Sequence, residues 1–277
     1  MPYSANQPSL VYNYALSVLE IIGDYFVSVS FDHYFMNMAG SFTKYPQTLY
    51  TADAYSTLVF SENVGTICIG GLYGRQNVYI VTQNPSWPTV SYSQKFLTNI
   101  QGKEYKYFGV TSNENSVYLV AGGSSSTQIQ SINFDDVRNL NDAKSKTWET
   151  IGQLSESVTS PGVEYLNAQL IVFYAKDSPG YIQTFILESG QSKKSVTSVI
   201  DTGLNQGLKF PGSYVNNDKL SLFGGYSVSE NCVQQVTDIS SLASVKWNCV
   251  SNSNTTLEGL VYPYSTGTYI SFANFMV

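Results

Sequence analysis

A short apolar segment that ends on paired glycines recurs along this chain of 277 residues. It occupies residues 66–71, 117–123 and 220–225. The first two glycine pairs lie 52 residues apart, and the third follows after a further 102 residues, which is two intervals of 51. A unit that returns at an interval near 50 residues is typical of repeat architectures, whose units bury their faces against one another. This spacing constrains the fold more than any other property of the sequence.

Other segments complete a four-stranded unit around the recurring one. Apolar segments without the glycines, at 25–30, 169–174 and 268–273, raise the number of units to six. A β-prone segment and a polar turn precede the recurring segment, at 107–115, 163–168 and 212–218. Asn and Asp in such turns tolerate the backbone of tight hairpins. Fourth strands are predicted at 88–90, 149–151 and 248–250, each after a tryptophan (Trp87, Trp148, Trp247), and at 45–48 and 195–200. Only one helical turn is expected, within 134–140.

The glycine pairs together with Trp87, Trp148 and Trp247 resemble the kelch family of β-propellers, and more loosely the galactose-oxidase-like propellers. The resemblance implies an all-β fold, a β-propeller of about six four-stranded kelch-like blades, in one domain that covers residues 1–277. It also implies that the glycine-ended segment is the second strand of its blade and that the loop after it faces the binding side. We expect residues 9–14 to close the ring as an outer strand of the last blade. Five or seven blades and a tandem of β-sandwiches are the alternatives.

Composition narrows the range of partners. The net charge is −6 with only 14 Lys and Arg, whereas a nucleic-acid binder needs a basic face. No apolar run approaches the roughly 20 residues that span a bilayer, and residues 1–8 lack the pattern of a signal peptide. We therefore expect no nucleic acid and no membrane insertion. Charged residues make up only 12% of the chain, so little charge is lost in acid, and we predict an acid-stable protein. Localisation is otherwise unknown, although an acidic extracellular or virion surface would suit this composition.

The sequence predicts no catalytic, metal or cofactor site. His33 is the only histidine, which excludes metal sites built from two histidines and the copper chemistry of galactose-oxidase-like enzymes. The carboxylates offer no obvious pair: the side chains of Asp135 and Asp136 diverge if the segment is extended, and Glu62, Glu114, Glu164 and Asp218 belong to different turns or edges. The glycines at 70–74 lack the Lys-Ser/Thr of a phosphate loop and are read as structural. A divergent hydrolase or lyase with carboxylates at the channel mouth remains the alternative function.

A weakly charged aromatic loop surface is the best candidate for recognition. Tyr and Arg are favoured anchors of interfaces. The candidate residues follow the second strands of four units, with Asp32 and His33 expected in a loop of the first unit; they are Asp32, His33, Tyr34, Tyr73, Arg75, Lys176, Asp177 and Tyr226. The expected function is a non-enzymatic interaction scaffold that binds a protein or glycan, for example as a structural or attachment protein of a virion or cell surface. Cys68 is expected in the core, and Cys232 and Cys249 are either bridged or reduced.

Overall fold

The computed structural model describes residues 6–24, 31–37, 39, 41–44, 57–70, 76–83, 95–100, 108–120, 127–155, 157–158, 161–166, 168–175, 180–186, 195–196, 212–216, 219–223, 234–238 and 248–250. In this part the protein is all-β, with five four-stranded antiparallel sheets and one short helix. Each sheet is a meander in which the strands pair in chain order. The predicted all-β class and the four-stranded unit are therefore confirmed.

The sheets follow one another along the chain. Sheet 1 contains β1 (Asn6–Asn13), β2 (Val18–Asp24), β3 (Phe31–Met36) and β4 (Phe42–Lys44). Sheet 2 contains β5 (Thr57–Ser61), β6 (Gly65–Ile69), β7 (Asn77–Gln83) and β8 (Lys95–Asn99). Sheet 3 contains β9 (Gly109–Ser112), β10 (Ser116–Val120), β11 (Gln128–Asn133) and β12 (Glu149–Gln153), with helix α1 (Leu140–Ser145) before its last strand. Sheet 4 contains β13 (Gly162–Leu166), β14 (Gln169–Ala175), β15 (Gly180–Ile186) and β16 (Ser195–Val196). Sheet 5 contains β17 (Gly212–Asn216), β18 (Lys219–Phe223), β19 (Gln234–Asp238) and β20 (Asn248–Val250).

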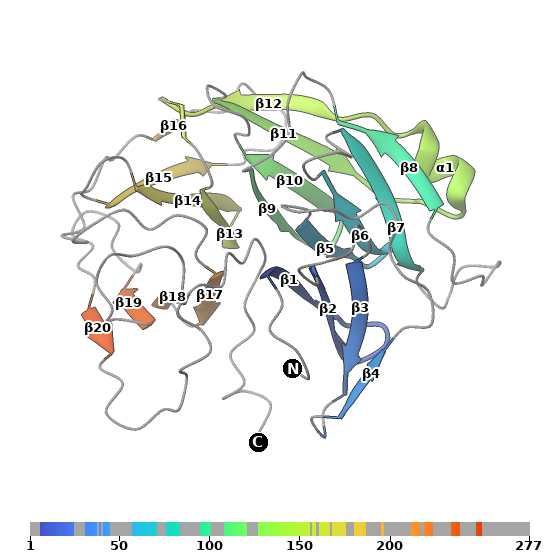
Figure 1. Ribbon diagram of the computed structural model, residues 1–277. Helices are drawn as coiled ribbons and strands as arrows, with labels where there is room; N and C mark the ends of the chain where they lie inside the picture. Colours follow the sequence, from blue (N-terminus) through green and yellow to red (C-terminus); the bar gives the residue numbers. More distant parts are fainter. Residues whose placement is uncertain are drawn as a thin grey trace.

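The first strands of the sheets lie next to one another. β1 contacts β5, β5 contacts β9, β9 contacts β13 and β13 contacts β17. In Figure 1 the sheets follow in chain order around the middle of the molecule, with these first strands nearest the middle and the fourth strands farther out. Each sheet can therefore place one face on the preceding sheet and the other on the following one.

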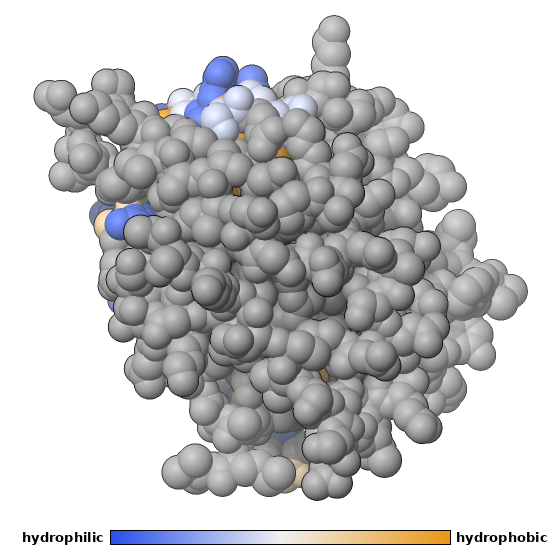
Figure 2. All heavy atoms as spheres, turned by 90° about the vertical axis from the view of Figure 1, so that its left-hand side faces the viewer, coloured by the Kyte–Doolittle hydropathy of each residue, from blue (hydrophilic) through white to orange (hydrophobic). Residues whose placement is uncertain are grey.

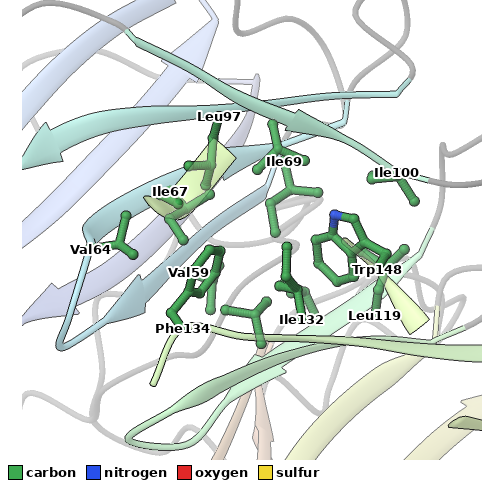
Figure 3. Close-up of a cluster of buried hydrophobic side chains, with 14 of the residues drawn as sticks. Val59, Val64, Ile67, Ile69, Leu97, Ile100, Leu119, Ile132, Phe134 and Trp148 are labelled. Carbon is green, nitrogen blue, oxygen red and sulfur yellow. The ribbon is translucent and has the colours of Figure 1, made fainter. Parts of the chain in front are cut away.

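Apolar side chains fill the space between sheets 2 and 3. Alternate residues of β6, Ile67 and Ile69, point to this side, where they meet Leu119 and Ile132 of sheet 3. Figure 3 shows this cluster, with the Trp148 ring on the same side of it as Ile100 and Leu119. Between sheets 3 and 4 a second apolar cluster joins Tyr118, Val120 and Ile129 to Val163, Leu170 and Val172. Burial of such faces is the main favourable term in folding, so these two contacts hold three sheets together.

Gly109 lies where sheet 3 closely approaches Pro161, the residue before sheet 4, and Val163 within that sheet. A Cβ atom at this position would lie 2.7 Å from the carbonyl oxygen of Pro161 and would also collide with the side chain of Val163. We expect Gly109→Ala to lower the free energy of unfolding by about 1–3 kcal/mol, as overpacking of a filled core does. Chemical denaturation measures the effect. Val163→Ala in the same chain removes part of the obstacle and should recover some of the loss, whereas an unchanged stability of Gly109→Ala would show that the backbones separate freely.

Most predicted strands of the later units are confirmed. The hairpins β9–β10, β13–β14 and β17–β18 pair as predicted, and the fourth strands β12 and β20 include the segments after Trp148 and Trp247. Gly70 adopts φ of 68°, so its structural interpretation is confirmed at a position that favours glycine. A strand, β7, and not a helix follows it, which agrees with the rejection of a phosphate loop. Cys68 is buried, as predicted.

The predictions for the first unit were wrong. Its second strand is β2 (Val18–Asp24) and not residues 25–28, which lie outside the described part of the chain. Residues 9–14 do not supply an outer strand of a last sheet, since β1 pairs with β2 and starts sheet 1.

The fourth strand of sheet 2 is β8 and not the segment after Trp87, and the helix begins at Leu140, after the predicted turn. A sixth unit at 268–273 lies outside the described residues.

Candidate functional site

The predicted recognition residues fall into two groups. Tyr73, Arg75, Lys176, Asp177 and Tyr226 lie outside the described residues. The strands that precede them are described: β6 ends at Ile69, β14 at Ala175 and β18 at Phe223. These five residues therefore follow second strands, as the repeat predicted, and their role stays a prediction.

The remaining three candidates lie in a strand and not in a loop. Asp32, His33 and Tyr34 belong to β3, where they pair with Gly23, Ile22 and Ile21 of β2. Tyr34 is half-buried and packs on Leu19, Ile21 and Met36. His33 is fully buried. The expectation of a loop was wrong because the second strand of the first unit was predicted at residues 25–28, after the actual second strand, β2. The loop expected after it therefore fell on the third strand, β3.

His33 belongs to a buried polar group between sheets 1 and 2, the Glu20 cluster, which consists of Asn13, Glu20, His33, Thr66 and Thr82. All five residues are buried. Oε1 of Glu20 accepts hydrogen bonds from Asn13 Nδ2 at 2.5 Å and from Thr66 Oγ1 at 2.6 Å. Oε2 accepts one from Thr82 Oγ1 at 2.7 Å and lies 2.8 Å from His33 Nε2. An ionised carboxylate only accepts, so this ring nitrogen carries the hydrogen.

Each member comes from a different strand. Asn13 ends β1, Glu20 lies in β2 and His33 in β3, while Thr66 of β6 and Thr82 of β7 approach from sheet 2. A β-bulge brings Thr82 into place: Thr66 pairs with Thr82, but Ile67 pairs with Ile80, which leaves Val81 as an extra residue. Val81 packs in the apolar cluster that faces sheet 1, and Thr82 also turns to that side. Bulges often redirect a side chain in this way.

The surroundings of Glu20 keep it ionised. Burial alone would raise the pKa of this carboxyl, but the hydrogen bond and the charge of His33, helped by the hydrogen bonds of Thr66 and Asn13, hold the pKa below its ordinary value. Each oxygen of Glu20 has two hydrogen-bond partners, and these replace the hydrogen bonds that water makes to an exposed carboxylate. Both oxygens of Glu20 are therefore satisfied inside a polar group whose five residues are all buried between the two sheets.

Sequence reasoning passed over Glu20. The residue is the only charged one in the apolar run of residues 18–22, and that contrast was the available signal. In a strand, Leu19 and Ile21 point to one face while Glu20 and Ile22 point to the other. A carboxylate on a strand that is apolar on both faces needs a buried partner, and the single histidine was the obvious one to seek.

The other described carboxylates do not form a catalytic pair. Glu62, Glu114, Asp135 and Asp136 are exposed, and Asp136 pairs with Arg138 at 3.0 Å. Glu164 is buried in β13, the edge strand of sheet 4, in agreement with the predicted strand before the turn at 166–168. Among the described residues no group of three His, Cys, Asp or Glu side chains is placed to hold a metal ion. These residues favour no particular hydrolase chemistry.

Tyrosines contribute to packing between sheets, as predicted for strand positions. The rings of Tyr118 in sheet 3 and Tyr165 in sheet 4 are stacked, with centroids 5.8 Å apart and planes inclined by 4°. Burial raises the pKa of Tyr118, and Tyr165 adds to the effect. Tyr14, at the turn after β1, is 66% exposed and contacts the ring of Phe60.

On the face shown in Figure 2, hydrophilic residues gather at the top of the view, and small hydrophobic areas show beneath them, at the left edge and near the bottom. Phe42 and Phe96 are large hydrophobic residues that are exposed. No helix of the described part is long and apolar enough to cross a bilayer. Cys249 lies in β20, while Cys232 lies outside the described residues, so their pairing stays open.

Comparison with known proteins gives a structural likeness only. No protein-family model matches the chain, and no curated protein matches it. Among solved structures, YjhT is similar with a TM-score of 0.60 and 13% sequence identity, over 88% of this chain and 84% of the YjhT chain. An identity this low speaks for a shared all-β fold and not for a shared activity.

Proposed function

We propose that the chain is a kelch-like β-propeller that acts as a non-enzymatic interaction scaffold, and that it binds a protein or a glycan through the loops after its second strands. The propeller is supported by the succession of contacts between first strands and by the repeated four-stranded meander. It is also supported by Leu19, Ile21 and Met36, which are buried on the face of sheet 1 directed away from sheet 2. A neighbouring sheet on that side would bury them in this way.

The observation that carries the binding role is the common direction of the second strands. The sheets have the same strand order, and their first strands meet in succession. The ends of β6, β14 and β18 therefore point to one side of the molecule. Tyr73 and Arg75 follow β6, Lys176 and Asp177 follow β14, and Tyr226 follows β18. Loops on a rigid β scaffold are the usual carriers of recognition, and Tyr and Arg are the side chains that most often anchor an interface.

A combined variant tests the surface. We expect Tyr73→Ala, Arg75→Ala and Tyr226→Ala together to weaken binding at least about tenfold, because such anchors commonly contribute more than 1 kcal/mol each. The measurement is titration of the purified variant against the partner captured from native material, and against a glycan array. The matched control is Glu62→Ala with Glu114→Ala, two exposed residues in the turns between first and second strands, at the opposite ends of the sheets. Equal binding by the combined variant and the wild type would contradict the proposal.

A further inference from the structure

The contact between sheets 1 and 2 differs in chemistry from the next contact along the chain. Its apolar part is a cluster of Val11, Ile22, Leu58, Phe60, Cys68 and Val81. Beside this cluster lie Glu20 and its four buried partners. The contact between sheets 2 and 3 contains a cluster of aliphatic and aromatic residues, and no described Asp, Glu or His of these two sheets is buried. Acid can therefore act on the first contact and has no comparable target among the described residues of the second.

The geometry of the Glu20 cluster fits one protonation state. The carboxylate oxygens accept from an amide, two hydroxyls and an imidazole, and all four of these groups donate. A protonated carboxyl carries a hydrogen on one of its two oxygens. That hydrogen would face one of the groups that donate to the same oxygen. A hydroxyl would then have to rotate and give up its bond, or the sheets would have to move apart. Rotation of the Thr66 hydroxyl is restricted further, because its Oγ1 also accepts a hydrogen bond from Asn13 Nδ2 at 3.2 Å.

We propose that the Glu20 cluster is an acid-operated clasp: uptake of a proton by Glu20 releases sheet 1 from sheet 2, while sheets 2 and 3 remain packed together. The clasp closes through bonds that cross between the sheets, from Thr66 and Thr82 of sheet 2 to Glu20 of sheet 1. When they are lost, the described contacts that still join the two sheets are the apolar cluster around Cys68, the ring contact of Tyr14 with Phe60 and the bond from Asn13 to Thr66, so opening becomes more frequent.

His33 is the only other titratable group that touches the carboxylate among the described residues. Asn13 on β1, Thr66 on β6 and Thr82 on β7 are neutral, and β5 presents Leu58 and Phe60 to this contact. Cys68 lies in the adjacent apolar cluster and does not titrate in acid. The proton responsible for opening in acid is thus assigned to Glu20.

The direction of the response follows from linkage. Glu20 has a pKa below its ordinary 4.5 in the closed clasp and returns to that value in the open one. The bonds therefore stabilise the closed form fully above pH 4.5, and the stabilisation is lost as the pH falls through the lower, closed-state pKa. Between these two values opening takes up one proton, so the open population rises by up to roughly tenfold per pH unit.

Two side chains already in place report on the two contacts separately. Cys68 is 2% exposed at the contact of sheets 1 and 2, and Trp148 is 2% exposed at the contact of sheets 2 and 3. In a background with Cys232→Ser, Cys249→Ser, Trp87→Phe and Trp247→Phe, they are the only thiol and the only tryptophan. The probe is 4,4′-dithiodipyridine, which also reacts in acid, with free cysteine as the reference at each pH. Trp148 fluorescence is read in the same samples.

We expect the relative reactivity of Cys68 to rise below pH 4.5 while the emission of Trp148 stays constant. Glu20→Gln, an uncharged isostere, should make Cys68 reactive at neutral pH and remove most of its acid response. The exposed Glu114→Gln is the matched control and should behave as the wild type. Thr82→Val, which removes one donor from Oε2, should move the onset of reactivity to higher pH and serves if Glu20→Gln fails to fold.

Three results would overturn the clasp. Cys68 could stay protected until the Trp148 emission changes as well, which is global unfolding. Glu20→Gln could keep the acid response of the wild type, which would assign it to His33. Thr82→Val could leave the onset of reactivity unchanged, which would show that the bond to Oε2 does not hold the sheets.

Discussion

Replacement of Glu20 by alanine is expected to lower the free energy of unfolding by about 3–5 kcal/mol at neutral pH, the range found when one partner of a buried ion pair is removed. The substitution leaves the hydroxyls of Thr66 and Thr82 without their acceptor and His33 Nε2 without its hydrogen-bond partner. The loss should shrink as the pH falls below 4.5, where the unfolded chain takes up a proton on Glu20, and should be smallest below the lower pKa of the folded state, where the wild-type carboxylate is protonated as well. Urea denaturation at several pH values measures both effects.

Glu114→Ala is the matched control for this experiment. Glu114 is exposed in the turn between β9 and β10, and its removal should change the stability by less than about 0.5 kcal/mol. A loss for Glu20→Ala no larger than that of the control, or one that is equal at all pH values, would show that the cluster contributes little to the folded state.

Replacement of Phe134 by alanine is the second large effect, with an expected loss of about 3–5 kcal/mol. The side chain is completely buried in the cluster between sheets 2 and 3, so truncation leaves a cavity. Its backbone N–H donates to the carbonyl of Asn115 at 2.7 Å, which limits how far this segment can collapse into the gap. Thermal and urea unfolding of the variant provide the measurement.

Phe96 offers the comparison within the same chain. It lies in β8 and is 42% exposed, and its ring contacts Tyr79 edge-on. Phe96→Ala should cost well under half as much as Phe134→Ala, because less apolar surface is returned to water. Similar losses at the two positions would mean that the contact between sheets 2 and 3 is less tightly filled than its buried residues indicate.

The sequence was most informative where a hairpin could be recognised by its turn. Asn113 shows why: its side-chain Oδ1 accepts from the backbone N–H groups of Asn115 and Ser116, so the turn chemistry that was read in the sequence is present in the structure. The recurring glycines located the ends of the second strands in later sheets. Gly70 shows the physical reason, because its φ is positive where the strand ends. These local rules, applied at a regular interval, were sufficient for the four-stranded unit.

The first unit lacked such local signals. Its apolar sequence continues from β2 into residues 25–28 without a glycine pair, so the end of the strand was invisible. The interval gave a warning, since residue 29 lies only 41 residues before Gly70, whereas Gly23 lies 47 before it. The bonds that Thr66 and Thr82 make to Glu20 could not be predicted, because these residues are separated from Glu20 by 46 and 62 residues.

The composition predicts acid stability, and the structure contains one feature that opposes it. The low number of charged residues limits the change in net charge as the pH falls. The buried carboxylate of Glu20, with its four donors, acts in the opposite direction, because its stabilisation depends on ionisation. The prediction of an acid-stable protein therefore depends on how low the pKa of Glu20 lies, and the Cys68 experiment measures that onset.

The polar face of sheet 1 also matters while the chain is being made. Each sheet consists of consecutive strands, so it can form as soon as its own residues have left the ribosome. Until sheet 3 has formed, a newly formed sheet 2 exposes an apolar face that is prone to aggregate. Sheet 1 waits for sheet 2 with Asn13, Glu20 and His33 on the waiting face, which water can solvate during the delay. We therefore expect this face of sheet 1, which also carries Val11 and Ile22, to aggregate less than the apolar face of sheet 2 while the chain is being made.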